Sequence, residues 1–302
     1  MILEIPMPWL AGPREELIAT GTPLTGPEGK DGLFLTKLPD GGLVGAAVAP
    51  PDLDPHAAAR FLYSRMLSSL SGNRLQRIWN YIPGINAEGN GLENYRAFNA
   101  GRQAAFITAH GPDFVPRLPA ASALGTNGGR MALCFLAGPG EPRHVENPEQ
   151  VPAFEYPAEY GASPPSFARA TTVSDASRQS YFLSGTASIK GHASLGADFA
   201  QQAGLTFDNV RLMFSRMALP PGTPGAWKIF LRHRADLPAA QAALAAAFPE
   251  ALPDAMFLEA DICRASLLLE VEATFHTPAA LAARDRDLPD PSAAETPECF
   301  PN

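Results

Sequence analysis

Apolar and polar positions follow the same order of patterns twice along this sequence. Each half begins with an apolar run typical of a strand, continues through a helical pattern, a second strand and a second helix, and closes on a pair of strands. The expected strands are 43–49, 77–82 and a pair at about 119–137 in the first half, and 180–189, 228–232 and a pair at about 256–275 in the second. Strands that alternate with helices predict an α/β fold, also describable as α+β layers, with a mixed sheet and helices packed on one face in each half.

Helix-start signals place three of the helices. Asp54 followed by proline opens the first helix of the first half. Asp236 and Pro238 open an alanine-rich helix that runs to about residue 248 in the second half. For the first helix of the second half, the sequence predicts Thr206 as the N-cap.

Weak self-similarity between the halves supports this repeated order. The tripeptide Ser-Arg-Met begins at Ser64 and again at Ser215, an offset of 151 residues that also places Arg77 over Lys228. The closing strands, MALCFLAG and SLLLEVEA, match at a shorter offset of 135 residues. This pattern indicates a duplicated unit, and the alternative is chance similarity between segments rich in alanine and leucine.

A proline-rich segment separates the two halves. Residues 139–166 combine prolines with Tyr156 and Tyr160, whereas a plain linker is usually rich in Gly, Ser or Pro and lacks aromatic residues. We therefore expect this segment to pack against or cover another part of the protein. The predicted organisation is a first half over 1–138, this connection, and a second half over 167–302 with a flexible tail after about 277.

The last strand of the second half carries two acids. Alternation puts Glu270 and Glu272 on one face, and Leu267, Leu269 and Val271 on the other. One carboxyl can be buried at the mouth of a cleft while the other reaches water. A carboxylic acid beside apolar surface has a raised pKa and acts as a general acid at neutral pH. The alternative is a polar strand face in contact with solvent.

The two closing strands differ at the positions of these acids. The matched strand of the first half has Phe135 and Ala137 at the places of the two glutamates. Only the second half carries acids there. The sequence therefore predicts one active site per chain, in the second half, with a non-catalytic copy in the first.

A cysteine lies close to the acids in sequence. A tight turn over 264–266 would form a hairpin that brings Cys263 to the face of Glu270. The alternative is that Cys263 is a small buried apolar residue, which is the usual role of a lone cysteine.

Arginines suit a ligand that carries carboxylates, because a guanidinium binds a carboxylate through two hydrogen bonds. The candidates are Arg96, Arg102, Arg169 and Arg264, each of which is otherwise a surface residue. The small residues of SGTASI, which begins at Ser184, would let a ligand approach the backbone closely, unless they mark a crowded crossing of the sheet.

Composition and charge narrow the function classes. The chain has 302 residues, 46% of them hydrophobic, and a net charge of −8, which repels nucleic acid. Its three cysteines lack the spacing of a disulfide framework or a metal site, so we expect no metal and a reducing cytoplasmic location. No apolar run is long enough to span a bilayer, and the N-terminal residues lack the pattern of a signal peptide.

Six ordered segments together resemble the chorismatase family, whose fold is Rid/YjgF-like. They are RIWNYIPGIN (from Arg77), ENYRAFNAGR (from Glu93), LPAASALG (from Leu118), YPAEYGASPPSFARA (from Tyr156), SGTASIKGH (from Ser184) and DICRASLLLEVE (from Asp261). The resemblance covers about residues 43–275 and implies two Rid-like units.

The resemblance implies an enzyme that removes the enolpyruvyl group of chorismate as pyruvate, without metal or organic cofactor. Glu270 would protonate the methylene carbon of the enol ether, because it matches the glutamate of the family motif; alternation alone does not choose between the two acids. Arg169 would hold a carboxylate, and Tyr156 or Tyr160 would line the ring. The pocket floor would be Gly185, Thr186 and Ala187.

Cys263 stands where the resemblance separates the product types. A cysteine there implies the branch that forms 3-hydroxybenzoate, alone or together with 4-hydroxybenzoate. The alternative within the family is hydrolysis to a dihydroxycyclohexadiene carboxylate.

Two other function classes are compatible with the sequence. One is a Rid-type deaminase or small-molecule sensor in which Arg264 holds a carboxylate, and the other is a binding or scaffold protein without catalysis. Rid relatives form homotrimers, which is one expectation for this chain; a monomer is another, since a duplicated chain satisfies some of those contacts internally.

Overall fold

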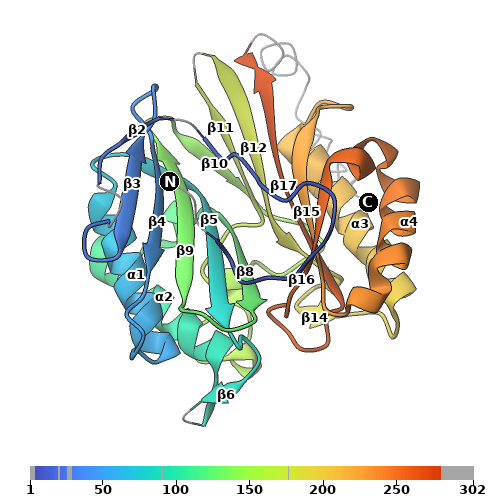
Figure 1. Cartoon of the computed structure of the whole chain (residues 1–302), viewed down its shortest axis with the longest axis horizontal. Coiled ribbons are helices and arrows are strands. Elements are labelled where there is room, and N and C mark those ends of the chain that lie inside the picture. Colours follow the sequence, from blue (N-terminus) through green and yellow to red (C-terminus); the bar gives the residue numbers. More distant parts are fainter. Residues whose placement is uncertain (1–3, 20, 26–28, 90, 176, 280–302) are drawn as a thin grey trace, which may run out of the picture.

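Two large β-sheets face each other at the centre of the molecule, and helices cover their outer faces (Figure 1). The computed structural model describes residues 4–19, 21–25, 29–89, 91–175 and 177–279. The flexible tail predicted after about 277 falls almost wholly outside these residues. The domain boundaries at 138 and 166 stay a prediction.

The first sheet has the strand order β2-β3-β4-β9-β5-β8. Its strands are β2 (Thr22–Pro23), β3 (Leu33–Lys37), β4 (Leu43–Val48), β5 (Arg74–Pro83), β8 (Ala120–Thr126) and β9 (Ala132–Gly138). Helices α1 (Pro55–Ser69) and α2 (Asn94–His110) bury their apolar sides against one face of this sheet. β5 and β8 run parallel while the other pairs are antiparallel, so the sheet is mixed.

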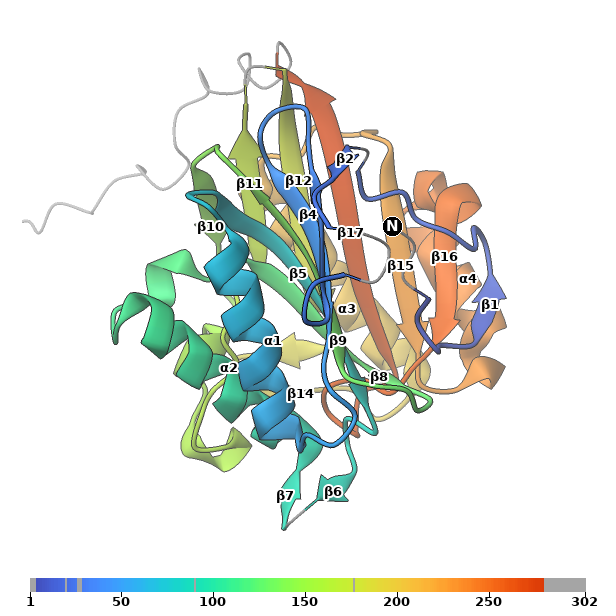
Figure 2. The same ribbon diagram turned by 60° about the vertical axis from the view of Figure 1, so that its left-hand side comes forward.

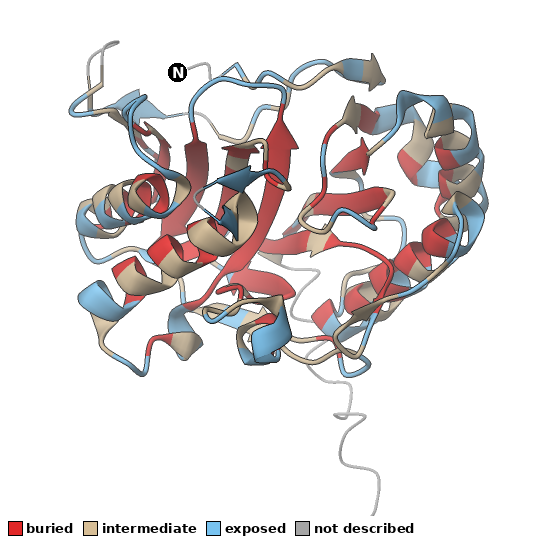
Figure 3. Cartoon of the chain, turned by 90° about the horizontal axis from the view of Figure 1, so that it is seen from below, coloured by how far each residue is buried: buried red, intermediate tan, exposed pale blue. Residues whose placement is uncertain are grey.

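The second sheet has the order β1-β16-β15-β17-β12-β11-β10. Its strands are β1 (Trp9–Ala11), β10 (Pro142–Val145), β11 (Ala170–Ser174), β12 (Arg178–Thr186), β15 (Gly225–Leu231), β16 (Ala255–Glu259) and β17 (Leu269–Pro278). Helices α3 (Phe199–Met217) and α4 (Leu237–Ala247) cover its outer face. Figure 3 shows the buried strands between the two helical layers. The predicted α/β fold, with a mixed sheet and helices on one face in each half, is confirmed.

The short elements lie in the connections. They are β6 (Glu88–Gly89), β7 (Leu92–Glu93), β13 (Ile189–Lys190), β14 (Ala193–Ser194) and the 3-10 turns Val115–Arg117, Ala153–Glu155, Ala158–Tyr160, Arg234–Asp236 and Pro249–Asp254. Tyr160 ends one of these turns, and Tyr156 directly follows another.

The helix starts agree with the sequence at two places and differ at one. Asp54 accepts a hydrogen bond from the backbone N–H of Ala57 at 2.8 Å, and α4 begins directly after Asp236. The prediction of Thr206 as an N-cap was wrong. α3 begins at Phe199, where Asp198 accepts a hydrogen bond from the backbone N–H of Gln201 at 2.9 Å, and Thr206 is buried inside the helix.

Strand register corrects the match between the closing strands. Arg77 in β5 pairs with Leu136 in β9, and its counterpart Lys228 in β15 pairs with Glu272 in β17. The first-half counterparts of Glu272 and Glu270 are therefore Leu136 and Cys134, rather than Ala137 and Phe135. A slip of one residue moves a side chain to the opposite face of a sheet. The first half still has no acid at these places.

The expected hairpin between the last two strands was wrong. β16 runs parallel to β15, and β15 lies between β16 and β17. The chain between β16 and β17 therefore crosses the end of β15, and this crossing carries Cys263 to the start of β17.

The N-terminal segment ties the two sheets together. β1 pairs with β16 of the second sheet, while β2 pairs with β3 of the first (Figure 2). Between them the chain crosses the gap between the sheets, which is filled by apolar side chains of both, including Trp79 and Phe182. The halves are also joined through Ser184, which donates to the carbonyl of Ala168 at 2.5 Å and accepts from the N–H of Ala121 at 2.9 Å.

Candidate active site

A cavity of about 240 Å³ opens beside the start of β17. All nine residues singled out from the sequence line it. They are Tyr156, Tyr160, Arg169, Gly185, Thr186, Ala187, Cys263, Arg264 and Glu270. Residues of both halves contribute to the wall, so the structure brings together segments that lie far apart in sequence.

Glu270 presents an uncharged carboxylic acid to this cavity. The side chain is 3% exposed, and its Oε1 has no hydrogen-bond partner among the described residues. Burial raises the pKa of Glu270 to about 8, and the nearby charge of Glu272 adds to the effect. Arg77 and Arg169 act in the opposite direction without cancelling it. At pH 7 the carboxyl is therefore mostly protonated and able to donate a proton.

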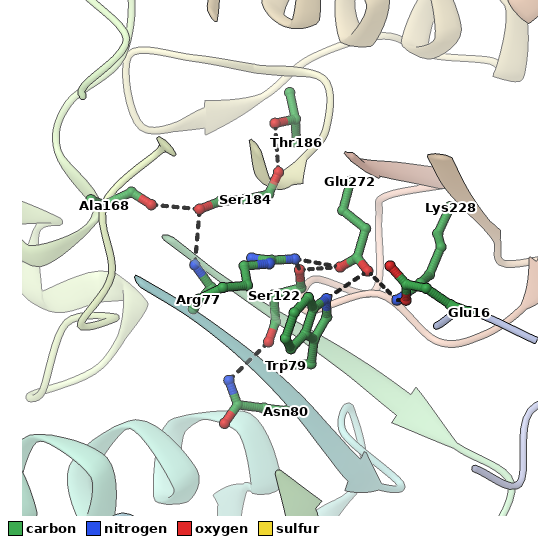
Figure 4. A network of polar contacts seen from close by, with 11 residues as sticks. Glu16, Arg77, Trp79, Asn80, Ser122, Ala168, Ser184, Thr186, Lys228 and Glu272 are labelled. Carbon is green, nitrogen blue, oxygen red and sulfur yellow. Dashed lines mark hydrogen bonds and ion pairs between the residues drawn. The ribbon is translucent and has the colours of Figure 1, made fainter. Parts of the chain in front are cut away.

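Glu272 has a different environment, and the expectation that one acid reaches water was wrong. Its side chain is also 3% exposed and lies between the two sheets (Figure 4). It accepts from Arg77 at 2.7 Å, Lys228 at 2.9 Å, Trp79 Nε1 at 3.0 Å, and the Ser122 hydroxyl. Although burial alone would raise the pKa of Glu272, the two cations hold it below its ordinary value. Glu272 is thus an ionised buried carboxylate that does not line the cavity.

Cys263 lies next to the Glu270 carboxyl without the hairpin that the sequence suggested. Its Sγ is 4.0 Å from Glu270 Oε2. Burial raises the pKa of the Cys263 thiol to about 12, and the neighbouring glutamate adds to this. The sulfur is therefore a neutral thiol rather than a thiolate nucleophile.

Two arginines and two tyrosines form one wall of the cavity. Arg169 is buried and donates to the Tyr156 hydroxyl at 2.7 Å and to the Val151 carbonyl at 3.2 Å, while its Nε has no partner among the described residues. Arg264 lies over the ring of Tyr160, 4.2 Å from its centroid. The tyrosines come from the connecting segment 139–166, which therefore helps to cover the cavity.

The other two candidate arginines differ in position. Arg96 lines the cavity and pairs with Glu93 at 3.5 Å, whereas Arg102 is buried within α2 and donates to Asn99 at 2.6 Å. Arg102 is therefore not a cavity residue.

Several lining residues were missed by the sequence reasoning. They include Glu93, Tyr95, Asn147, Gln150 and Met213. Glu93 and Tyr95 stand at the start of α2, within the ENYR segment whose arginine was considered. This cluster of polar and aromatic residues at a helix start was the available signal. Asn147 and Gln150 carried no signal, because they come from an irregular part of the connecting segment.

Within the described ranges, no group of three or more His, Cys, Asp or Glu side chains is placed to hold a metal ion. Among the helices of those ranges, none has the length and apolar character needed to cross a membrane.

Comparisons with known proteins agree on one family. The family model described as chorismatase FkbO/Hyg5-like, N-terminal, matches residues 37–137. A 3-hydroxybenzoate synthase of Streptomyces hygroscopicus is 35% identical over 247 residues, which are 75% of this chain and 72% of that protein. A chorismatase of Streptomyces rapamycinicus is 33% identical over 259 residues, covering 80% and 76%.

Solved structures were compared as well. The crystal structure of a chorismatase superposes with a TM-score of 0.74 at 31% identity, covering 82% of this chain and 78% of that one. RidA from an Antarctic Psychrobacter bacterium aligns over 100% of its own length with 45% of this chain, with a TM-score of 0.34 and 15% identity.

Proposed function

The chain belongs to the chorismatase family, and from this premise we propose that it converts chorismate into 3-hydroxybenzoate and pyruvate. That it is a chorismate-converting enzyme follows from its relatives. The nature of the product and the roles of individual residues are the proposal. The observation that carries it is the uncharged Glu270 carboxyl in the wall of a cavity that three arginines also line.

Proton transfer from Glu270 begins the reaction. The acid gives its proton to the methylene carbon of the enolpyruvyl ether, which leaves a cationic centre at the ether carbon. Protonation of a weakly basic carbon is the difficult step, and a partly desolvated acid with a pKa near the working pH is suited to it. The ring hydroxyl next to the ether then adds at the cationic carbon and returns its proton to the Glu270 carboxylate, which gives a cyclic ketal. The bond between that hydroxyl oxygen and the ring breaks as the ring carbon that bears the ether loses its proton, so the ring becomes aromatic. The remaining hemiketal collapses to pyruvate, and the ring oxygen takes up the released proton as the phenol of 3-hydroxybenzoate.

Arginine and tyrosine side chains would orient the substrate. Arg169 is held against Tyr156 and keeps an unpartnered Nε, so it can accept a substrate carboxylate without first losing a strong ion pair. Backbone at Gly185 closes the floor of the cavity opposite, directly beside the Glu270 carboxyl. This arrangement supports a planar carboxylate-bearing ring held between the arginine wall and the acid.

The proposal is tested by incubating the purified protein with chorismate and separating the products by chromatography. We expect pyruvate and 3-hydroxybenzoate in equal amounts, without added metal or cofactor. A dihydroxycyclohexadiene carboxylate in place of the aromatic acid would contradict the product assignment. Absence of any turnover would contradict the proposed function.

Replacement of Cys263 by alanine is expected to change the products rather than stop the reaction. The thiol touches the Glu270 carboxyl, so its removal alters the surroundings of the cationic intermediate while the acid remains. The aromatic product should fall in favour of the dihydroxycyclohexadiene carboxylate, with pyruvate still formed. Chromatography of both products measures the ratio.

Cys134 provides the matched control for this variant. It is buried between the sheets, outside the cavity lining, and Cys134→Ala should leave the product ratio unchanged. An unchanged ratio in Cys263→Ala as well would remove the thiol from the mechanism.

A further inference from the structure

Four charged side chains form a cluster between the two sheets, three of them buried and the fourth, Glu16, partly exposed. Arg77 comes from β5 and Lys228 from the equivalent position of β15, and both pair with Glu272 on β17 (Figure 4). Glu16, from the N-terminal segment, pairs with Lys228 at 2.5 Å. Two cations thus face two anions, so the cluster is electrically balanced when Glu270 carries no charge.

Arg77 is the member of this cluster that still has N–H groups available for another acceptor. Its guanidinium is 1% exposed and donates through Nη2 to Glu272 and to the Ser122 hydroxyl. Within the described chain, its Nε and Nη1 atoms have no partner, and neither does Oε1 of Glu270. Glu270 and Glu272 lie on the same face of β17 with Cα atoms about 7 Å apart, so the two carboxyls compete for one buried cation.

We propose that Glu272 is a positioning residue for the reaction. By holding Arg77 in an ion pair between the sheets, it prevents that guanidinium from pairing with Glu270 and so leaves Glu270 as an uncharged acid at the cavity. This role rests on the proposed function of Glu270. In this role the first half supplies a cation to the active site of the second half, since Arg77 binds Glu272 although it lies 195 residues before it in sequence.

Other ionisable groups face Glu270 and stay constant in the test. They are Arg169 before β11, Cys263 and Arg264 from the segment before β17, and Tyr95 from α2. The pKa of Tyr95 is raised by burial and that of Cys263 by burial and by Glu270, so both remain neutral. Arg169 favours the ionised form of Glu270 in the parent and in every variant, so a difference in the Glu270 titration between them reports on Glu272 and Arg77.

The test compares three variants by titration. In Glu272→Gln, the nearby negative charge of Glu272 is lost and Arg77 loses its counter-ion, so the pKa of Glu270 should fall by one unit or more. In Arg77→Met, a cation that opposes protonation is absent, and the pKa should rise. Glu16→Gln removes a carboxylate from the far end of the same cluster and should leave the pKa unchanged. Carbon-13 NMR of labelled glutamate carboxyls measures these values directly, and kcat/KM against pH is recorded in parallel.

The expected kinetic result follows from the direction of each shift. Activity requires protonated Glu270, so the alkaline limb of kcat/KM should move to lower pH in Glu272→Gln and to higher pH in Arg77→Met. At pH 8 the glutamine variant should lose at least tenfold relative to its own value at pH 6. The double variant Arg77→Met/Glu272→Gln removes both charges together, and its limb should return toward that of the parent.

Two outcomes would overturn the proposal. One is an unshifted Glu270 titration in Glu272→Gln. The other is a uniform loss of activity at all pH values in both single variants, which indicates only structural damage. If the NMR titration moves while the kinetic limb does not, Glu272 still controls the charge of Glu270, but the assignment of Glu270 as the acid fails and the role of Glu272 in the reaction fails with it. Should Glu272→Gln fail to fold, Arg77→Met and the double variant still decide the question.

Discussion

Replacement of Glu270 by glutamine is expected to lower kcat for chorismate by about 10²–10⁴-fold, the usual contribution of a general acid. Glutamine keeps the shape of the side chain but has no proton of comparable acidity to give. Substrate binding should change little, because the arginine wall is untouched, so KM should stay within a few-fold of the parent. Steady-state kinetics with pyruvate as the measured product gives both constants. Turnover at the parent rate would show that another group supplies the proton.

The same variant should be more stable than the parent in alkaline solution. The pKa of Glu270 is near its ordinary value in the unfolded chain and about 8 in the folded protein. The folded state therefore binds the proton more tightly, and its stability falls as pH rises from about 4.5 through 8. Glutamine does not titrate, so its advantage grows by about 1.4 kcal/mol for each pH unit between the two pKa values and should be about 4 kcal/mol larger at pH 9 than at pH 5.

Denaturant unfolding at pH 5 and pH 9 checks this difference. At pH 5 the two proteins should differ little, since Glu270 is protonated in the folded parent and is only partly ionised in the unfolded chain. A constant difference at both pH values would mean that the carboxyl does not titrate abnormally. Loss of activity together with a gain in stability is the behaviour expected of a group that is buried for catalysis rather than for folding.

Structural features that depend on local sequence patterns could be predicted from the sequence. Period-two alternation placed Glu270 and Glu272 on one face of a strand, and the helix-start residues Asp54 and Asp236 placed α1 and α4. The family motifs selected eight residues, and the arginine candidates added Arg264; the structure collects these nine in one cavity, while their roles stay a prediction. These successes rest on short segments whose residues act within one strand, one helix or one motif.

Features that depend on distant partners could not be found in the same way. Alternation shows that Glu272 shares a face with Glu270, but not that Arg77 lies across from it on the other sheet. The sequence analysis expected one of the two acids to be in contact with water, and for Glu272 this expectation was wrong. β1 and β2 are only three and two residues long, so they carry no periodic signal from which the crossing of the N-terminal segment could be predicted.

The two halves contribute differently to the charged cluster between the sheets. Each sheet directs a cation into the space between them, Arg77 from one and Lys228 from the other. A sheet with an apolar strand at the place of β17, as in the first half, has nothing to neutralise such a cation. Glu272 and Glu16 together balance the two cations, so the interface between the sheets holds three buried charges and one that is partly exposed.

Replacement of Gly185 by alanine is expected to reduce kcat by about 10²-fold while leaving the fold intact. A Cβ at this position would come within 2.6 Å of Cδ of Glu270 and closer still to Oε1. The atoms it meets are the far end of a flexible side chain, so Glu270 can move aside at a cost in stability of about 1 kcal/mol or less. The acid then no longer points at the substrate, and a displacement of about 1 Å is enough for this loss of rate.

Gly204 supplies the matched control. It lies inside α3, and a Cβ there would meet no atom within 4 Å. Gly204→Ala should leave kcat unchanged and raise the free energy of unfolding by about 0.5–1 kcal/mol, because alanine favours the helix. The two glycine variants are compared by steady-state kinetics and by denaturant unfolding.

A double variant separates the action of Gly185 on Glu270 from any other effect. If alanine acts only by displacing the acid, Gly185→Ala should cause no further loss in a protein that already carries Glu270→Gln. A second loss of similar size in the double variant would show instead that Gly185 shapes the substrate site directly. Only the first result shows that Gly185 acts through Glu270. The double variant therefore decides whether Gly185 positions the acid or contacts the substrate.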